Sequence, residues 1–260
     1  MTPAFSLITV VRNNPQVAEA VASVLDQDYP GRIESIVIDG ASTDGTLAAL
    51  APLRGRLAHL VSEPDRGIYD AMNKGLRLAT GDLVGLLNAD DLYQDRQVFA
   101  RVARAFEDPA VEACFGDLVY VRAEDPTRVL RYWKSGPPRP DAFQWGWMPP
   151  HPTLFLRRGV YERLGLFDLR YRIASDYEFM LRVLLKHRLK AVYLPEVLVR
   201  MRAGGASNGS LKGILRANAE CRRAFRDLDL PCTPLFTPAK LARHAAQLFR
   251  RPPRSLVAAG

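Results

Sequence analysis

Cysteines and long apolar runs are scarce in this sequence, and both absences narrow the class of protein. The 260 residues contain only Cys114, Cys221 and Cys232, which show neither metal-ligand nor redox spacing, so we expect reduced cytosolic thiols. No apolar run approaches the roughly 20 residues that span a bilayer. The apolar run from Phe5 to Val11 lacks the basic lead-in and the cleavage site of a signal peptide, so we interpret it as a strand and do not expect export.

Glycine-rich phosphate loops are also absent. No Gly-x-Gly-x-x-Gly follows the first expected strand, and no Gly-x-x-x-x-Gly-Lys-Ser/Thr occurs anywhere in the sequence. These absences argue against a dinucleotide-binding dehydrogenase and against a P-loop enzyme. With 48% hydrophobic and 25% charged residues, the chain has the composition of an ordinary globular protein of one large or two small domains.

Positive charge is concentrated near the C-terminus. The chain has a net charge of +8, and from Arg200 onward Lys and Arg outnumber Asp and Glu by 12 to 3. The rest of the chain is therefore close to neutral, and the basic character belongs to the tail.

Carboxylates stand directly after two of the expected strands. The apolar run of residues 83–87 is followed by Asn88, Asp90 and Asp91, and the run 33–38 is followed by Asp39. In an open α/β sheet, ligands bind where the carboxyl ends of the strands meet, and carboxylate oxygens there suit Mg²⁺ or Mn²⁺ bound to phosphates. Two simpler interpretations stay open, namely that Asp91 caps the next helix and that Asp39 begins a capped turn.

Two more charged residues are expected near this edge. Apolar residues recur at helical spacing between residues 66 and 79, after a strand expected at 57–61. Arg66 and Asp70 lie in the first turns of this helix and hence close to the end of the preceding strand. A solvated helix surface would also explain them.

Four stretches resemble the successive motifs of family 2 glycosyltransferases and follow one another in the family's order. They are Ser6 to Asn13, Val37 to Gly45, Ser62 to Gly75 and Leu87 to Asp91. The third is most similar to that of bacterial enzymes that assemble exopolysaccharide, capsule or O-antigen repeats. The resemblance implies an α/β protein with a GT-A domain at 1–205. A Rossmann-like nucleotide-binding half with a mixed sheet (1–93) would precede an acceptor-binding half (94–205) and a basic tail of C-terminal helices (206–260).

The resemblance also implies roles for the residues at the sheet edge. The donor would be a nucleotide-sugar, with a UDP-sugar as the first expectation and GDP- and dTDP-sugars as alternatives. Asp91 would ligate Mn²⁺ or Mg²⁺. The family's metal motif is usually Asp-x-Asp, whereas its first position here is Asn88. The implied donor-binding residues are Thr9, Val11, Arg12, Asp39, Arg66, Asp70, Asn88 and Asp90.

The second half of the chain supplies further candidates. The proline-rich stretch 136–150 predicts an irregular loop over the site, in which Trp145 and Trp147 either contact sugars or pack in the core. His151, in a strand predicted at 151–156, is either structural or a further metal ligand. Asp176 opens a helix predicted at 173–185 and matches the family's general base, with Glu178 as the fallback; helix capping is the alternative role.

Inverting sugar transfer requires such a carboxylate, because a base must take the acceptor hydroxyl proton on the face opposite the departing diphosphate. The sequence therefore predicts a metal-dependent inverting glycosyltransferase of bacterial surface polysaccharide synthesis. We expect it to add one sugar to a lipid-linked saccharide acceptor. No Gln-x-x-Arg-Trp occurs, which disfavours a processive synthase. The alternatives are a nucleotidyltransferase acting on sugar phosphates and a non-catalytic nucleotide-binding membrane adaptor.

Two amphipathic helices are expected in the tail. The first, at 211–228, would pack on the body of the protein. The second, at 238–251, has the spacing of a helix that lies on anionic lipid, with a solvated surface as the alternative. We therefore expect a cytoplasmic protein at the inner face of the cell membrane, and no nucleic-acid partner, because the basic residues lack interleaved aromatics. The apolar face of this helix comprises Leu241, Ala245, Leu248 and Phe249, flanked by Lys240, Arg243, Arg250 and Arg251.

Overall fold

The computed structural model of the protein describes residues 2–204 and 211–248. Strands and helices alternate in the first half, as the sequence predicts. They are β1 (Phe5–Val11), α1 (Val17–Leu25), β2 (Ile33–Asp39), α2 (Thr46–Leu50), β3 (His59–Ser62), α3 (Ile68–Leu78), β4 (Leu83–Asn88), β5 (Asp91–Tyr93) and α4 (Val98–Ala105). The second half contains β6 (Ala113–Val121), β7 (Val129–Trp133), β8 (Phe155–Arg157), α5 (Arg158–Leu164), α6 (Ser175–Met180), β9 (Ala191–Arg202), α7 (Leu211–Asp227) and α8 (Phe236–Leu248).

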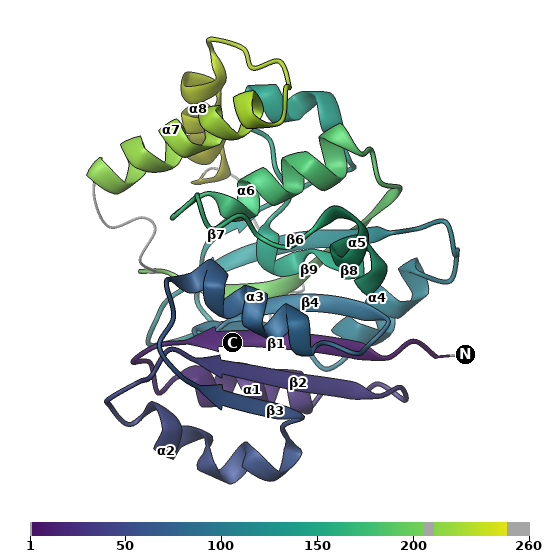
Figure 1. Cartoon of the computed structure of the whole chain (residues 1–260), viewed down its shortest axis with the longest axis vertical. Coiled ribbons are helices and arrows are strands. Elements are labelled where there is room, and N and C mark those ends of the chain that lie inside the picture. The colour runs from purple at the N-terminus through teal and green to yellow at the C-terminus, as the bar shows by residue number, and fades with distance from the viewer. Residues whose placement is uncertain (1, 205–210, 249–260) are drawn as a thin grey trace.

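One mixed sheet runs through the molecule, with helices on both faces (Figure 1). Its strand order is β3-β2-β1-β4-β8-β6-β9-β5, and β7 pairs with β6. The strands β1 to β4 are parallel, and in register Val11 lies opposite Asp39 and Asp39 lies opposite Ser62. Val10 lies opposite Asn88. The carboxyl ends of these four strands therefore meet at one edge of the sheet, which we call the carboxyl edge.

The sheet is buried on both faces because its central strands are mainly apolar. Every residue of β1 is buried. Ile8 packs with Met72 of α3 on one face, whereas Leu7 packs with residues of α1 and α4 on the other. Gly75 lets α3 approach the sheet closely, because a Cβ atom at this position would lie 2.4 Å from the Ile8 side chain.

The two C-terminal helices lie together at one end of the molecule, next to α6 (Figure 1). Phe225 of α7 and Phe236 of α8 pack against Tyr177 of α6, with ring centroids 6.1 and 5.9 Å apart. Gly146 has a φ of +74° and touches Lys240 of α8, so the proline-rich loop supports this helix. The prediction that the first tail helix packs on the body is confirmed.

Several local predictions need correction. The stretch 136–150 is not wholly irregular, because Pro140–Trp145 forms a 3₁₀ helix whose leading proline already has a helical φ. The strand predicted at 151–156 instead begins at Phe155, after a 3₁₀ turn at His151–Thr153. The helix predicted at 173–185 begins at Ser175 and becomes π-helical at Leu181–Lys186.

The tail also departs from the simplest expectation for an amphipathic helix. Leu241 of α8 is 50% exposed, so its apolar face is not the one that packs on the body. Leu248 lies at the end of α8, and its side chain is outside the described part, as are Phe249, Arg250 and Arg251. Within the described residues, no helix is long and apolar enough to cross a membrane.

Candidate active site

A two-residue turn between β4 and β5 carries the candidate metal ligand. Asp91 opens β5, and α4 begins only at Val98, so Asp91 is not a helix cap. Asn88 Nδ2 donates to Asp91 Oδ2 at 2.9 Å. Asp91 Oδ1 is buried and has no hydrogen-bond partner. Burial raises the pKa of the Asp91 carboxyl well above its usual value, and the neighbouring charge of Asp90 adds to this effect.

These properties of Asp91 fit a ligand of a divalent cation. A buried oxygen without a partner is unfavourable, and a cation would satisfy this oxygen and favour the ionised carboxylate. Among residues 2–204 and 211–248, no three His, Cys, Asp or Glu side chains gather into a protein-only metal site. A cation here would therefore take most of its ligands from phosphate and water oxygens, as Mg²⁺ commonly does. A ligand role for His151 stays a prediction.

Arg202, at the end of β9, holds the turn that contains Asp90. Its guanidinium donates to the Asp90 carbonyl at 3.2 Å and to the Ala123 carbonyl at 3.1 Å. It also pairs with Glu19 of α1. Arg202 was not among the residues predicted from the sequence, because its partners come from three distant segments and no local pattern marks it.

The nucleoside-binding candidates lie at the carboxyl edge but differ in exposure. Thr9 and Val11 are buried within β1, and Thr9 Oγ1 has no hydrogen-bond partner. Arg12 is exposed, and its side chain lies beside Gly40. Asp39 is buried, and its carboxylate accepts hydrogen bonds from the Ser42 amide (3.0 Å), the Ser42 hydroxyl and the Ser62 hydroxyl (2.6 Å). These bonds fix the Asp39 side chain at the end of β2.

The loop between β3 and α3 brings Arg66 and Asp70 to the same edge. The Asp70 carboxylate accepts a hydrogen bond from the Arg66 amide at 3.0 Å and pairs with the Arg66 guanidinium at 3.3 Å. The hydrogen bond from the Arg66 amide and the interaction with the Arg66 guanidinium together lower the pKa of Asp70. Because the Arg66 side chain is 78% exposed, its guanidinium remains accessible to a ligand at the edge.

Asp176, in the first turn of α6, faces two side chains from other segments. Tyr69, in the first turn of α3, places its hydroxyl 2.9 Å from Asp176 Oδ1 and 2.6 Å from the Ile173 carbonyl. His151 Nδ1 lies 3.5 Å from Asp176 Oδ2. Since α3 begins where β3 ends, these contacts place Asp176 at the carboxyl edge.

The pKa values of Tyr69 and His151, the two side chains that face Asp176, are both shifted. Burial raises the pKa of Tyr69, and the charge of Asp176 adds to the rise. Burial lowers the pKa of His151, although Asp176 opposes this shift. Tyr69 and His151 are therefore both uncharged at neutral pH. The Asp176 side chain is 19% exposed, so it remains accessible to a ligand. Tyr69 was not among the residues predicted, because its partners Ile173 and Asp176 lie more than a hundred positions later in the chain.

The fallback candidate Glu178 has a different environment. Arg182 donates to both of its oxygens, at 3.1 and 2.9 Å. The same guanidinium donates to the Leu164 and Leu166 carbonyls at 2.5 and 2.8 Å. Burial raises the pKa of Glu178, and Arg182 opposes the rise. Glu178 thus takes part in a buried structural ion pair, which leaves Asp176 as the more accessible carboxylate of α6.

The two tryptophans of the proline-rich loop have separate locations. Trp147 is 7% exposed, packs against Phe143, and donates from Nε1 to the Ser135 carbonyl at 2.9 Å. It therefore belongs to the core. Trp145 is 41% exposed, and its carbonyl accepts a hydrogen bond from Arg243 of α8.

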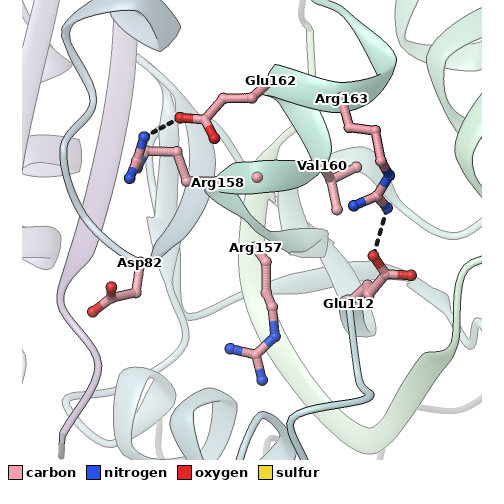
Figure 2. Close-up of a pocket in the computed structure, with 8 residues that line it drawn as sticks. Asp82, Glu112, Arg157, Arg158, Val160, Glu162 and Arg163 are labelled. Atoms are coloured by element: carbon pink, nitrogen blue, oxygen red, sulfur yellow. Dashed lines mark hydrogen bonds and ion pairs between the residues drawn. The ribbon is translucent and has the colours of Figure 1, made fainter.

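A cavity of about 310 Å³ lies away from these residues (Figure 2). It is lined by residues that include Asp82, which precedes β4, and Arg157, which ends the antiparallel β8. It therefore lies at the sheet edge opposite the carboxyl edge. Much of its charge is already paired, as in the bonds of Arg158 with Glu162 and of Arg163 with Glu112.

The chain combines a mixed α/β sheet with acidic residues at its carboxyl edge, where ligands bind in open α/β sheets. The model of the family "Glycosyl transferase family 2" matches residues 6–165, and the chain belongs to this family. A PGL/p-HBAD biosynthesis glycosyltransferase of Mycobacterium tuberculosis is 31% identical over 211 residues, which cover 79% of this chain and 80% of that protein. An uncharacterized glycosyltransferase of the same species is 36% identical over 192 residues, 70% of each chain.

Solved structures show the same fold. The mannosyltransferase PcManGT from Pyrobaculum calidifontis, in complex with GDP-Man and Mn²⁺, superposes with a TM-score of 0.62 at 23% identity, over 98% of this chain and 78% of that one. The S. aureus TarS 1–349 structure in complex with UDP-GlcNAc gives a TM-score of 0.64 at 18% identity, over 93% and 72%. The GT-A fold expected from the sequence is confirmed.

Proposed function

We propose that this protein is a metal-dependent, inverting glycosyltransferase that moves one sugar from a nucleotide-sugar donor to a hydroxyl of a saccharide acceptor. Membership of the family supports transfer of a sugar, and the neighbours that hold GDP-Man with Mn²⁺ and UDP-GlcNAc support a nucleotide-sugar donor. The observation that carries the proposal is the partly exposed Asp176 carboxylate, fixed by Tyr69 at the carboxyl edge.

Asp176 is the proposed general base. Its carboxylate would accept the acceptor hydroxyl proton as the new bond forms. Tyr69 binds one carboxylate oxygen at 2.9 Å, which leaves the other oxygen, on the His151 side, for the acceptor. Holding the base in place reduces the entropy that would otherwise be lost on reaching the reactive geometry.

The donor would lie along the carboxyl edge, in a donor half formed by residues 1–93, with the acceptor in the half formed by 94–205. We propose Thr9, Val11, Arg12 and Asp39 for the nucleoside, and Arg66, Asp70, Asn88 and Asp90 for the ribose and diphosphate. Asp91 would hold Mn²⁺ or Mg²⁺, which, when bound, stabilises the negative charge of the departing diphosphate. The buried, unpartnered oxygen of Asp91 supports this assignment.

A thermal-shift screen identifies the donor. UDP-, GDP- and dTDP-sugars are added with and without Mn²⁺, and a ligand that binds only the folded protein raises its melting temperature. We expect one nucleotide class to raise it, and only in the presence of the metal. If none of the nucleotide-sugars raises the melting temperature, with or without Mn²⁺, the donor assignment is contradicted.

The Asp176→Asn variant then tests the base. Release of nucleoside diphosphate from the selected donor is followed with a panel of saccharide acceptors. We expect kcat to fall by ~10²–10⁴ with little change in donor affinity, as for loss of a general base. Glu178→Gln is the comparison variant, and its kcat in the folded enzyme should stay near wild type. Equal activity of Asp176→Asn and wild type would remove Asp176 from the mechanism.

We further propose that the acceptor is lipid-linked and that the protein works at an anionic membrane surface. Trp145 and Leu241 are 41% and 50% exposed. Arg243, two residues after Leu241 in α8, donates to the Trp145 carbonyl at 2.9 Å. Exposed apolar side chains and a cation therefore occur together at this end of the molecule, the combination that favours an anionic lipid interface.

Vesicle flotation tests the membrane surface. Wild-type protein should float with vesicles that contain anionic phosphatidylglycerol and less with neutral phosphatidylcholine vesicles. The double variant Trp145→Ala, Leu241→Gln should lose most of this binding. Leu47→Gln is the matched control, because Leu47 is also exposed (38%) but lies on α2, at the opposite end of the molecule from α8 (Figure 1). Equal flotation of all three proteins would contradict the proposal.

A further inference from the structure

A glutamate of the C-terminal helix α7 binds the backbone just before the proposed base. Glu220 Oε2 accepts hydrogen bonds from three consecutive amides, those of Arg172 (3.0 Å), Ile173 (2.8 Å) and Ala174 (3.0 Å). Its other oxygen accepts a hydrogen bond from Arg216, one turn earlier in α7, at 3.2 Å. Asp176 follows these amides within two residues.

Glu220 fixes the backbone that leads into α6, where the local sequence offers no capping side chain. The residue before α6 is Ala174, which has no side-chain oxygen to bind the free amides at the helix start. Glu220, which is 9% exposed, binds instead the three amides that precede the helix, from a position more than forty residues later in the chain. Burial alone would raise the pKa of Glu220, but the three amides and Arg216 outweigh it, so the pKa is lowered and the carboxylate stays ionised.

The contacts continue from Glu220 to the Asp176 side chain. Ile173, whose amide binds Glu220, presents its carbonyl to the Tyr69 hydroxyl at 2.6 Å. The same hydroxyl lies 2.9 Å from Asp176 Oδ1. A shift of the 172–174 backbone would therefore change both the start of α6 and the position of the hydroxyl that orients Asp176.

We propose that Glu220 is a positioning residue for Asp176. Helix α7 would then contribute to catalysis, although it lies outside residues 6–165, the stretch that the family model matches. The proposal rests on the proposed function, because it requires Asp176 to be the base. Glu220 itself binds backbone amides and Arg216, and acts through the position of the Asp176 carboxylate.

Kinetics of Glu220→Ala and Glu220→Gln test the proposal. Small displacements of a catalytic group reduce rates strongly, so we expect Glu220→Ala to lower kcat by about 10- to 100-fold. The dissociation constant of the donor, measured by calorimetry with Mn²⁺, should change less than about 2-fold, since the donor site lies in the first half. Glu220→Gln keeps an acceptor oxygen for the amides and should lose clearly less activity than the alanine variant.

Asp227→Ala is the matched control on the same helix. The Asp227 carboxylate accepts a hydrogen bond from the Tyr171 hydroxyl at 2.8 Å and pairs with Arg223. It ties α7 to the same loop without contacting the amides before α6. We expect Asp227→Ala to lower the melting temperature while kcat, measured well below that temperature, stays within about 2-fold of wild type.

The double variant Glu220→Ala, Asp176→Asn separates positioning from loss of stability. If Glu220 acts through Asp176, its removal should reduce the residual rate of Asp176→Asn by less than about 2-fold. A kcat near wild type for Glu220→Ala beside an inactive Asp176→Asn would overturn the positioning role and leave the proposed base in place. Full additivity of the two losses would also overturn it. An active Asp176→Asn would instead overturn the proposed base, and the role of Glu220 with it.

Discussion

Replacing Asp91 by asparagine should separate metal binding from stability. Asp91 is 1% exposed, and its Oδ1 atom is buried without a partner. Without a bound cation this carboxyl either carries a poorly solvated charge or binds a proton, which is why burial raises its pKa. Asparagine is nearly isosteric, carries no charge, and still offers an oxygen to Asn88 Nδ2. We therefore expect the variant to be more stable than wild type without metal, although it loses function.

The size of the effect follows from the burial of this one side chain. A buried polar group left unsatisfied costs about 1–3 kcal/mol, with charged groups at the upper end or beyond. In the variant, the uncharged amide nitrogen of asparagine occupies the position of Oδ1 and also lacks a partner. We therefore expect the substitution to remove only part of this cost, about 1–2 kcal/mol. For a domain of this size, 1 kcal/mol corresponds to roughly 2–4 °C, so the melting temperature should rise by roughly 2–8 °C.

The assay is a thermal melt in EDTA, then with Mn²⁺, and then with Mn²⁺ and the donor. Asp91→Asn should melt higher than wild type in EDTA and lose the metal-dependent rise caused by the donor. Asp44→Asn is the control, since Asp44 is an exposed carboxylate at the same sheet edge, and it should retain that rise. A variant that melts lower than wild type in EDTA would refute the argument from burial, and one that keeps the metal-dependent rise would refute the ligand assignment.

Three further predictions follow from individual contacts. Tyr69→Phe removes the hydroxyl 2.9 Å from Asp176 Oδ1; a hydrogen bond to a charged group is worth about 1.5–3 kcal/mol, so kcat should fall by about 10- to 100-fold with unchanged donor affinity, and an unchanged kcat would show that other contacts orient the base. Gly75→Ala would place a Cβ atom 2.4 Å from Ile8 and should lower the free energy of unfolding in urea by about 1–3 kcal/mol; a gain in stability would mean that helix propensity outweighs the clash. Burial alone would raise the pKa of Glu34, but the hydrogen bonds from Ser6 and Thr80 outweigh burial, so the pKa is lowered. The stability that Glu34 contributes is therefore present above its unfolded pKa of about 4.3 and is lost as the pH falls below it, so the melting-temperature gap between wild type and Glu34→Gln should narrow from pH 6 to pH 3; a constant gap would contradict the shift.

Local patterns were sufficient for the first half of the fold. The apolar runs at β1, β2 and β4 and the helical spacing of α1 and α3 are local signals, and parallel strands separated by helices determine which strand ends lie together. For this reason the sequence alone predicts that Asp39, Asn88 and Asp91 lie at one edge of the sheet. It did not locate the 3₁₀ turns, because proline ends regular strands and helices but is compatible with the first position of a helical turn.

The choice between neighbouring carboxylates required the tertiary structure. Asp176 and Glu178 are two positions apart on α6, and only the packing shows that Arg182 pairs with Glu178 whereas Tyr69 and His151 face Asp176. The motif order, the strand and helix pattern and the family are properties of the chain read locally, since backbone preference and side-chain periodicity act over a few residues. The partners of Asp176, of Arg202 and of Glu220 come from segments distant in the chain, and side-chain contacts of this kind exist only once the helices and strands have packed.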